Sequence, residues 1–296
     1  MKNPIQPATG AAASADVQAT AQADVARALA EDVGAGDLTA ALIDPARRVR
    51  ARVLAREEAV ICGAPWAEAA LRALDPGVRL AWHVAEGQRC AADQVVLEIE
   101  GQARALLSAE RPALNFLQLL SAVATKTRRY VDALAGTRAQ IVDTRKTLPG
   151  LRMAQKYAVR MGGGTNHRIG LHDAVLIKEN HIAAAGGVTA VLRAAQAAAG
   201  AKFIEIECET LAQLDEALQA GARMVLLDNM PLALLNEAVR LNAAHPAGPA
   251  VLEISGGVTL EGLRALAETG VDRISIGTLT KDVKAIDFSM RVQELA

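Results

Sequence analysis

The first hydrophobic pattern along the chain is that of an amphipathic helix beginning at about Ala21. Val25, Leu29 and Val33 recur at a spacing that places them on one helical face. A segment containing two glycines then ends the pattern. Residues 1–18, which precede the helix, combine alanine with polar residues and have no comparable face, so we expect a disordered tail.

Short apolar runs typical of strands follow between Arg48 and Ile99, and turns containing proline or glycine separate them. We interpret residues 19–125 as an N-terminal α+β domain, in which antiparallel strands pack with two or three helices. A long helical pattern begins at Glu110 and leads out of this domain, with Pro112 expected in its first turn.

After Ala139, apolar strands alternate with helical patterns, which predicts a parallel sheet. The strand interiors are apolar throughout, as in parallel strands buried on both faces. Six strands are clear, short of a complete (β/α)₈ barrel, so we predict an incomplete α/β barrel of six to seven strands over residues 126–281. A doubly wound open sheet is the alternative. The predicted strands are 140–144, 174–178, 202–207, 223–228, 250–255 and 273–277, and the helices are 189–199, 211–220, 231–243 and 260–269.

Composition narrows the classes of function. Of the 296 residues, 51% are hydrophobic but only 2% are aromatic, and the formal net charge is −1. Such a chain has neither the positive field nor the stacking side chains of a nucleic-acid-binding protein, and we expect no membrane partner. No apolar run approaches the ~20 residues of a membrane span. With three widely spaced cysteines and no secretory signal pattern, we expect a cytoplasmic protein whose thiols are reduced.

Cationic side chains gather where the predicted barrel strands end. Arg145 and Lys146 follow the first strand, Lys178 ends the second, and His167 and Arg168 lie in a glycine-rich loop between them. The carboxyl ends of barrel strands meet at one face, where barrel enzymes carry their sites. Guanidinium groups present paired donors that match carboxylates and phosphates. The pattern therefore predicts a pocket for an anionic ligand.

Acidic residues and glycines occupy the later strand ends. Glu207 and Asp228 are suited to Mg²⁺ shared with phosphate oxygens, or to ribose hydroxyls, whereas Glu205 could equally form an ion pair inside the barrel. The turn Ser255-Gly256-Gly257 and the turn at Gly277 offer free backbone N–H groups to a phosphate. No zinc-ligand spacing, nucleophile elbow or Walker loop is present in the sequence.

The chain resembles quinolinate phosphoribosyltransferase, the carboxylating nicotinate-nucleotide pyrophosphorylase of NAD biosynthesis. The most specific segments are D-T-R-K-T-L-P-G (143–150) and G-G-G-T-N-H-R-I-G-L (162–171). Further matching segments follow in the family's order and cover most of the chain from residue 21 onward. They are 31–39, 110–125, 204–211, 226–230, 252–258 and 269–280.

The resemblance implies a homodimer, with an N-terminal α/β-sandwich domain and an incomplete barrel. It implies that the tail, 282–296, packs back on the N-terminal domain. It further implies that Arg145, His167, Arg168 and Lys178 bind quinolinate, together with Arg111 from the neighbouring subunit. By the same resemblance, three residues act on phosphoribosyl pyrophosphate and Mg²⁺, and four hold the 5′-phosphate. The residues that act on phosphoribosyl pyrophosphate and Mg²⁺ are Lys146, Glu207 and Asp228. The residues that hold the 5′-phosphate are Ser255, Gly256, Gly257 and Gly277.

The expected reaction transfers the phosphoribosyl group to quinolinate with loss of CO₂, giving nicotinate mononucleotide and pyrophosphate. It needs no organic cofactor, because the alkylated ring nitrogen itself accepts the electrons of the leaving carboxylate. Two alternatives remain. One is a nicotinate-type phosphoribosyltransferase, and the other is a non-catalytic relative associated with molybdenum uptake. The presence of Lys146, Glu207 and Asp228 favours the catalyst.

Overall fold

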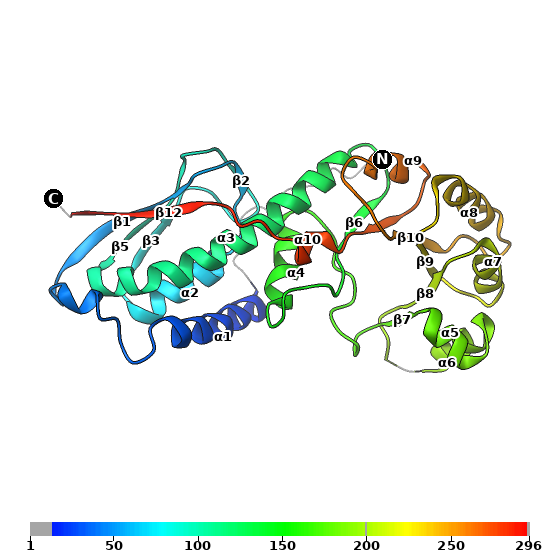
Figure 1. Cartoon of the computed structure of the whole chain (residues 1–296), viewed down its shortest axis with the longest axis horizontal. Coiled ribbons are helices and arrows are strands. Elements are labelled where there is room, and N and C mark those ends of the chain that lie inside the picture. The colour runs from blue at the N-terminus through cyan, green and yellow to red at the C-terminus, as the bar shows by residue number, and fades with distance from the viewer. Residues whose placement is uncertain (1–13, 199, 295–296) are drawn as a thin grey trace. The chain divides into compact units, whose positions relative to one another are not determined.

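A computed structural model describes residues 14–198 and 200–294 (Figure 1). The chain forms two compact units. Within the described residues, unit 1 comprises 14–128, 148–163 and 279–294, and unit 2 comprises 129–147 and 164–278. Unit 1 thus takes in the segment 148–163, which lies inside the predicted second domain.

Helix α1 (Ala15–Asp32) begins six residues before the predicted start at Ala21. Alanine has the highest helix propensity, and Asp16 places a negative charge in the first turn, where the helix dipole favours it. Of the predicted apolar face, Val25 is buried and Leu29 packs partly buried against the core, whereas Val33 lies at the C-cap, just outside the helix. Residues 14–18 of the predicted tail therefore include the first turn of this helix, and residues 1–13 lie outside the described residues.

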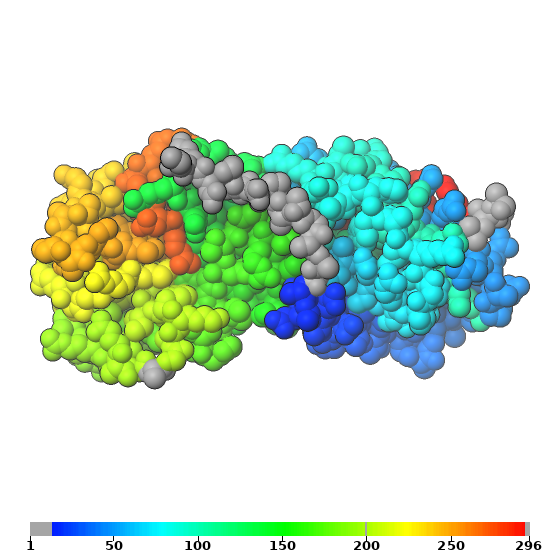
Figure 2. Space-filling model, turned by 180° about the vertical axis from the view of Figure 1, so that it is seen from behind, coloured from blue at the N-terminus to red at the C-terminus, as the bar shows by residue number. Residues whose placement is uncertain are grey.

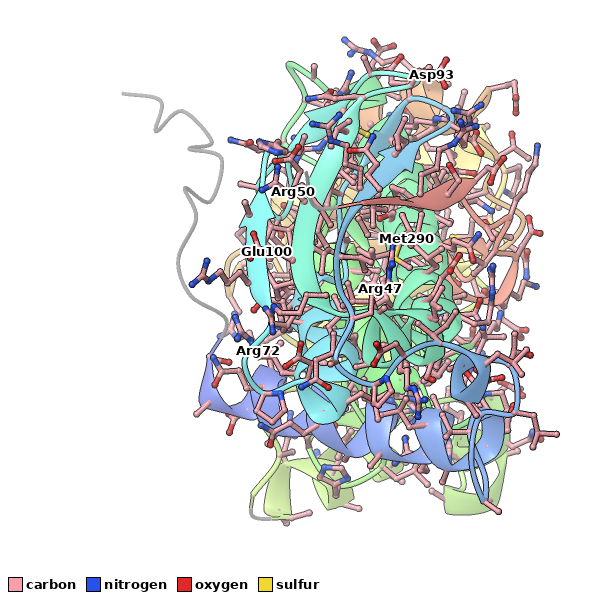
Figure 3. The ribbon with its side chains drawn as sticks, turned by 90° about the vertical axis from the view of Figure 1, so that its left-hand side faces the viewer. Arg47, Arg50, Arg72, Asp93, Glu100 and Met290 are labelled. Atoms are coloured by element: carbon pink, nitrogen blue, oxygen red, sulfur yellow. The ribbon has the colours of Figure 1, made fainter. Side chains whose placement is uncertain are left out.

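Unit 1 is built on an antiparallel four-stranded sheet in the order β12-β1-β5-β3. Buried and exposed residues alternate along β1, so that Val49, Ala51 and Val53 face the core. On the outer face, Arg50 of β1 lies opposite Glu100 of β5 with their charged groups 3.6 Å apart (Figure 3). The strands are β1 (Arg48–Ala55), β3 (Arg79–Trp82), β5 (Val95–Gln102) and β12 (Phe288–Glu294), and a smaller sheet pairs β2 (Ala59–Val60) with β4 (Arg89–Cys90).

Helix α3 (Ala103–Ala133) is longer than predicted, so the placement of Pro112 in a first helical turn was wrong. The run A-R-A-L-L-S-A before Glu110 consists largely of strong helix formers, and the helix therefore begins before it. Pro112 consequently lies in the helix interior, where its ring nitrogen has no hydrogen to donate to the carbonyl group of Ser108. The other helices of unit 1 are α2 (Ala64–Leu74), the 3₁₀ turn η1 (Ala40–Leu42) and α4 (Arg152–Met161), which was not predicted.

Unit 2 contains six parallel strands in the order β6-β11-β10-β9-β8-β7. Strands β7 to β11 are neighbours in sequence order, and the first strand, β6, pairs with the last, β11. This is the order of a barrel that is open between β6 and β7, and it excludes the doubly wound alternative. The strands are β6 (Gln140–Val142), β7 (Val175–Ile177), β8 (Ile204–Cys208), β9 (Met224–Asp228), β10 (Val251–Ser255) and β11 (Arg273–Ser275).

The helices of unit 2 follow the strands and cover one face of the sheet (Figure 1). Helices α7 and α8 form much of the yellow and golden surface of this unit when it is seen from behind (Figure 2). The helices are α5 (Glu179–Ala185), α6 (Val188–Ala197), α7 (Leu211–Gln219), α8 (Leu232–Ala244) and α9 (Leu263–Glu268). The short α10 (Thr278–Lys281) follows β11, and all but its first residue belongs to unit 1. Helix α5, which begins directly after Lys178, was not predicted.

The cysteines of the chain are all buried and unbonded, as expected for thiols that act as small apolar side chains. They lie at positions 62, 90 and 208. In the described parts of the chain, no helix combines the length and the apolar character needed to cross a membrane.

Candidate active site

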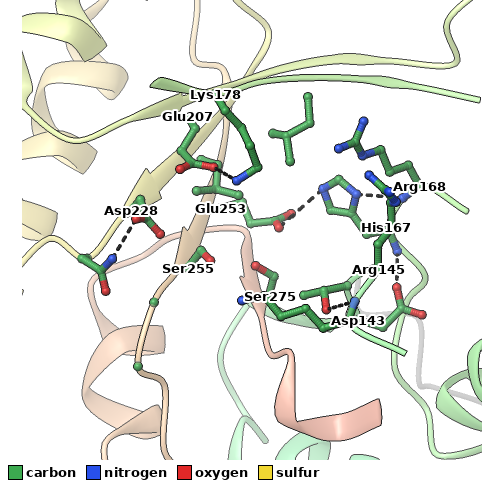
Figure 4. A pocket seen from close by; sticks show the side chains of 17 residues that line it. Asp143, Arg145, His167, Arg168, Lys178, Glu207, Asp228, Glu253, Ser255 and Ser275 are labelled. Atoms are coloured by element: carbon green, nitrogen blue, oxygen red, sulfur yellow. Dashed lines mark hydrogen bonds and ion pairs between the residues drawn. The ribbon is translucent and has the colours of Figure 1, made fainter. Parts of the chain in front are cut away.

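A cavity of about 460 Å³ opens at the carboxyl ends of the strands of unit 2 (Figure 4). Parallel register brings these ends together; Ser255 of β10, for example, lies opposite Asp228 of β9. Most of the residues predicted for the site line this cavity. They are Arg145, Lys146, His167, Arg168, Lys178, Glu207, Asp228, Ser255, Gly256 and Gly257.

Two predicted residues do not line the cavity. Arg111 is an exposed residue of α3 in unit 1. Gly277 follows β11 beside Lys146, and a Cβ atom there would come within 3.0 Å of Cδ of that lysine. In this structure, the absence of a side chain at Gly277 therefore leaves space for the stem of Lys146.

A buried carboxylate that the sequence reasoning missed holds the glycine-rich loop. Thr165 forms a bridge to Val142 of β6, and Asp143 follows directly. The Asp143 carboxylate accepts hydrogen bonds from the backbone N–H of His167 at 2.8 Å and from the side-chain amide of Asn166 at 2.6 Å. The loop is thus tied to the first strand at the position where its cationic side chains are needed. The sequence signal that could have identified Asp143 was its place directly after the apolar residues of β6.

Both ring nitrogens of His167 bond to the protein. Nδ1 accepts a hydrogen bond from the backbone N–H of Arg168 at 2.7 Å, so this nitrogen carries no proton. The proton is therefore on Nε2, which donates to Oε2 of Glu205 at 2.7 Å. The imidazole is largely buried, and its edge packs on Phe203. These bonds fix the tautomer and the orientation of the ring.

Two guanidinium groups share one side of the cavity. Burial lowers the pKa of Arg168, and the charge of Arg145 lowers it further, although Asp173 and Glu205 oppose this. Asp173 also accepts hydrogen bonds from the backbone N–H groups of Ile169 and Gly170, which orders the chain after Arg168. Two like charges held together in a partly buried pocket are stabilised when an anion lies between them.

Lys178 and Glu207 form an ion pair across the ends of β7 and β8, with Nζ and Oε2 2.7 Å apart. Glu207 is nearly buried, whereas the Lys178 side chain is half-exposed. This carboxylate is a hard oxygen donor facing the same cavity as the Asp228 carboxylate on the adjacent strand, β9. The two acids are therefore the members of the cavity best suited to Mg²⁺.

At the opposite end of the cavity, the Asn229 side chain packs closely against the backbone of Gly256. Asn229 adopts the left-handed conformation, with φ of 52°, and its side-chain amide donates to Oδ2 of Asp228. Gly256 has φ of 97°, and a Cβ atom there would lie 2.1 Å from Oδ1 of Asn229. Only glycine fits at this point of the Ser255-Gly256-Gly257 turn. Asn229, which had no assigned role in the sequence analysis, thereby fixes both Asp228 and the turn.

Two fully buried glutamates, Glu205 and Glu253, lie beneath the cations; the sequence reasoning considered only an ion pair inside the barrel for Glu205 and gave no role to Glu253. Oε1 of Glu253 lies 3.7 Å from Nε2 of His167, and Oε2 lies 3.0 Å from Nε of Arg273 without the alignment of a hydrogen bond. Burial raises the pKa of Glu205 and the pKa of Glu253 to about 7 each. For Glu253, the signal in the sequence was a charged residue inside the otherwise apolar strand segment L-E-I-S (252–255).

The atoms of His167, Glu205 and Glu253 that could serve as metal ligands lie within 4.8 Å of one another. The shortest separation in the group, 2.7 Å, is nevertheless that of a hydrogen bond. Arg273 already supplies positive charge beside Glu253. We therefore interpret the group as a hydrogen-bonded His167–Glu205 pair with Glu253 beside it, and not as a metal site.

Comparisons with known proteins agree with this architecture. Models of the N-terminal and C-terminal domains of quinolinate phosphoribosyl transferase match residues 37–121 and 123–291. A probable nicotinate-nucleotide pyrophosphorylase (carboxylating) of Bacillus subtilis is 44% identical over 263 residues, 88% of this chain and 90% of that protein. The corresponding protein of Mycobacterium leprae is 44% identical over 273 residues, 90% of this chain and 95% of its own.

A solved structure of the nicotinate-nucleotide pyrophosphorylase from Francisella tularensis has the same fold. It superposes with a TM-score of 0.89 at 41% identity, over 93% of this chain and 97% of that one. The family models together span both units and most of the described residues, including every residue that lines the cavity. The resemblance noted in the sequence is thereby confirmed, and the chain belongs to the quinolinate phosphoribosyl transferase family.

Proposed function

We propose that this protein transfers the phosphoribosyl group of phosphoribosyl pyrophosphate to quinolinate and releases CO₂, so that nicotinate mononucleotide and pyrophosphate are formed for NAD biosynthesis. The observation that carries the proposal is one cavity that combines the cations Arg145, Arg168 and Lys178 with the acids Glu207 and Asp228. The names of the family and of its members with more than 40% identity agree with it.

Quinolinate carries two adjacent carboxylates, and the cation-rich side of the cavity suits such a dianion. Arg145 and Arg168 would each pair with a carboxylate, and Lys178 would add a third positive charge. His167 would contribute by fixing the backbone of Arg168, since its ring nitrogens bond to the protein. We propose that the active form is a homodimer in which Arg111 of the partner subunit completes this group.

The phosphoribosyl donor would occupy the other end of the cavity. The free N–H groups of Ser255-Gly256-Gly257 suit its 5′-phosphate, and Gly277 leaves space for Lys146 to reach the pyrophosphate. Asp228 would bind the ribose hydroxyls or the metal. This division of the cavity would bring the ring nitrogen of quinolinate toward C1 of the ribose.

Mg²⁺ fits the donor set of this cavity. Glu207 and Asp228 offer carboxylate oxygens from neighbouring strands, and Mg²⁺ is commonly held by one or two carboxylates together with substrate phosphate oxygens. When bound, the ion would neutralise charge on the departing pyrophosphate. We propose that the protein uses Mg²⁺ and no organic cofactor, and that it acts in the cytoplasm.

The chemistry requires the chain to bind and orient rather than to attack. The ring nitrogen of quinolinate displaces pyrophosphate from the ribose, and Lys146 stabilises the charge that develops on the leaving group. The alkylated ring is cationic, so the electrons of the breaking bond to the 2-carboxylate stay on the ring carbon beside N⁺ as CO₂ departs. The Arg145 and Arg168 pair holds the carboxylates until that point.

The deciding experiment mixes the purified protein with quinolinate, phosphoribosyl pyrophosphate and Mg²⁺ and measures nicotinate mononucleotide and CO₂. A matched reaction replaces quinolinate with nicotinate, which lacks the 2-carboxylate. We expect product from quinolinate only. Product from nicotinate alone would identify a nicotinate-type enzyme, and binding without turnover of either acid would support the non-catalytic relative.

A further inference from the structure

Glu253 is an unexpected residue in a cavity that attracts anions. It lies on β10 with no exposed surface, yet its side chain lines the cavity and points toward the ring of His167 (Figure 4). Among the described residues, neither carboxyl oxygen has a hydrogen bond of good geometry, although Nε of Arg273 lies 3.0 Å away and the Ser275 hydroxyl group lowers the pKa of Glu253. A buried carboxyl group without hydrogen bonds is costly in its ionised form, whereas the protonated form carries no charge to compensate.

The charged groups around Glu253 come from three other elements. Glu205 of β8 and His167 of the glycine-rich loop face it on one side, and Arg273 of β11 lies on the other. Burial is the main cause that raises the pKa of Glu253, and the charge of Glu205 raises it further, against His167 and Arg273. With a pKa of about 7, this carboxyl group is protonated in a large fraction of molecules near neutral pH.

The proposed reaction leaves one proton unaccounted for. When CO₂ departs, the electron pair of the broken carbon–carbon bond remains on the ring carbon, and that carbon must gain a proton before nicotinate mononucleotide is complete. Guanidinium groups are poor proton donors, and the ammonium group of Lys178 is held in an ion pair with Glu207. His167 has its only N–H proton in a bond to Glu205.

We propose that Glu253 is the proton donor to the ring carbon from which CO₂ has left. This inference rests on the proposed function. In the step, the O–H bond of Glu253 breaks, a C–H bond forms at the ring carbon, and the resulting carboxylate regains a proton from water when the product has left. The neutral acid also explains how a glutamate lies beside the carboxylates of a dianion without repelling it.

The first test compares Glu253→Gln with the unchanged protein. Glutamine has the same shape but no acidic proton, so we expect kcat to fall about 100-fold while quinolinate still binds. Loss of CO₂ is reversible until the ring carbon is protonated, so pyrophosphate should be released in the first turnover while the ribosylated dicarboxylate accumulates in chemically quenched samples. Glu253→Asp, which keeps the acid, should recover part of the rate. A kcat within threefold of the unchanged protein, or failure to release pyrophosphate in a correctly folded variant, would overturn the proposal.

The pH profile gives a second test that does not depend on the Glu253 variants. Since the protonated acid is required, kcat of the unchanged protein should fall as the pH rises above about 7. Glu205→Gln removes a negative charge that raises the pKa of Glu253 but keeps an acceptor for His167. The decline should then move to lower pH, and an unmoved decline would count against Glu253. If the unchanged protein makes no nicotinate mononucleotide at all, the proposed function fails instead.

Discussion

At the scale of single residues, the cavity depends on atoms packed too closely to allow substitution. The Ser255-Gly256-Gly257 turn contains two glycines with positive φ that differ in their surroundings. Gly256 lies against Asn229, whereas a Cβ atom at Gly257 would meet nothing within 4 Å. The two positions therefore separate the cost of backbone conformation from the cost of a steric clash.

Gly256→Ala should disrupt the phosphate end of the cavity. The new Cβ atom would displace Asn229 and, with it, Asp228, and we expect a loss of about 1–3 kcal/mol in the free energy of unfolding. The KM for phosphoribosyl pyrophosphate should rise at least tenfold, while the dissociation constant of quinolinate changes little. Urea denaturation and steady-state kinetics would measure both effects. Gly257→Ala is the matched control, and equal losses in the two variants would contradict the steric account.

At the scale of elements, the loop 162–170 contributes two of the side chains that line the cavity, and buried acids connect it to the barrel strands. Asp143 is the strongest of these connections, because it is fully buried and accepts two hydrogen bonds. Replacing it leaves the backbone N–H of His167 without its acceptor inside the protein. Arg168 is the next residue, so its position depends on the same bond.

Asp143→Ala should therefore affect both stability and binding. Two buried donors lose their acceptor, and we expect the free energy of unfolding to fall by about 2–4 kcal/mol. Quinolinate affinity should fall at least tenfold, as measured by isothermal titration calorimetry. Asp143→Asn keeps an oxygen for the His167 N–H group and should retain most of the affinity. An unchanged affinity in the alanine variant would show that the loop keeps its position without this aspartate.

The Glu86 carboxylate, which lies in a turn later in the chain, caps the N-terminus of helix α2 in unit 1. Glu86 accepts hydrogen bonds from the backbone N–H groups of Gly63 and Ala64 at 2.7 and 3.1 Å. Burial nevertheless raises the pKa of Glu86 above its ordinary value of 4.5, against these two bonds. A carboxyl group with a raised pKa in the folded state contributes stability below the unfolded-state pKa, and this is lost as pH rises through the folded-state pKa.

We expect Glu86→Gln to remove the contribution of Glu86 to the pH dependence of stability. The free energy of unfolding of the variant should increase relative to that of the unchanged protein as pH rises from about 4.5, because the glutamine stays neutral and does not lose stability. Urea denaturation across a pH series would measure the difference. Glu31→Gln on the exposed surface of α1 is the control for changing a glutamate. A constant difference between the Glu86 variant and the unchanged protein would refute the prediction.

The sequence predicted elements well where burial is uniform along them. The strands of unit 2 are largely apolar because both of their faces are covered, so each was found within two residues of its observed ends, even where a buried glutamate interrupts β8 or β10. Helix α4 was missed because it buries Gln155 and Lys156, which conceal the hydrophobic period. The Gln155 side chain instead bonds to the backbone of Leu148 and Thr280, partners that no local pattern indicates.

The residues of the site were predictable where their position along a strand or in a motif was informative. Residues that end a strand or occupy a family motif were identified, including Arg145, Lys178 and Asp228. Glu253 and Asp143 were not, because their importance comes from neighbours on other strands, and such neighbours are known only after folding. Spacing along one strand shows that a charged residue is inside the barrel, but it does not show which groups surround it.

At the scale of the whole molecule, the proposed sharing of Arg111 can be tested with hybrid dimers. If each site uses Arg111 of the partner subunit, mixing inactive Arg111→Ala and Arg145→Ala proteins creates one intact site in every hybrid dimer. Random exchange of subunits should then restore about one quarter of the normal activity. Mixing Arg145→Ala with Lys178→Ala is the control, because both changes affect the same cavity. Restoration in the control alone, or in neither mixture, would show that Arg111 does not act in trans.

The pairing of β12 with β1 has a consequence for how the chain is made. Strand β1 is synthesised well before its partner, residues 288–294. At ordinary rates of protein synthesis, the hydrogen-bonding edge of β1 waits roughly 10–30 s for that partner after residue 128 has been added. During this interval the nascent chain presents an open strand edge, which neighbouring nascent chains or chaperones can bind. Unit 1 is thus closed only after the segments of unit 2 have been made.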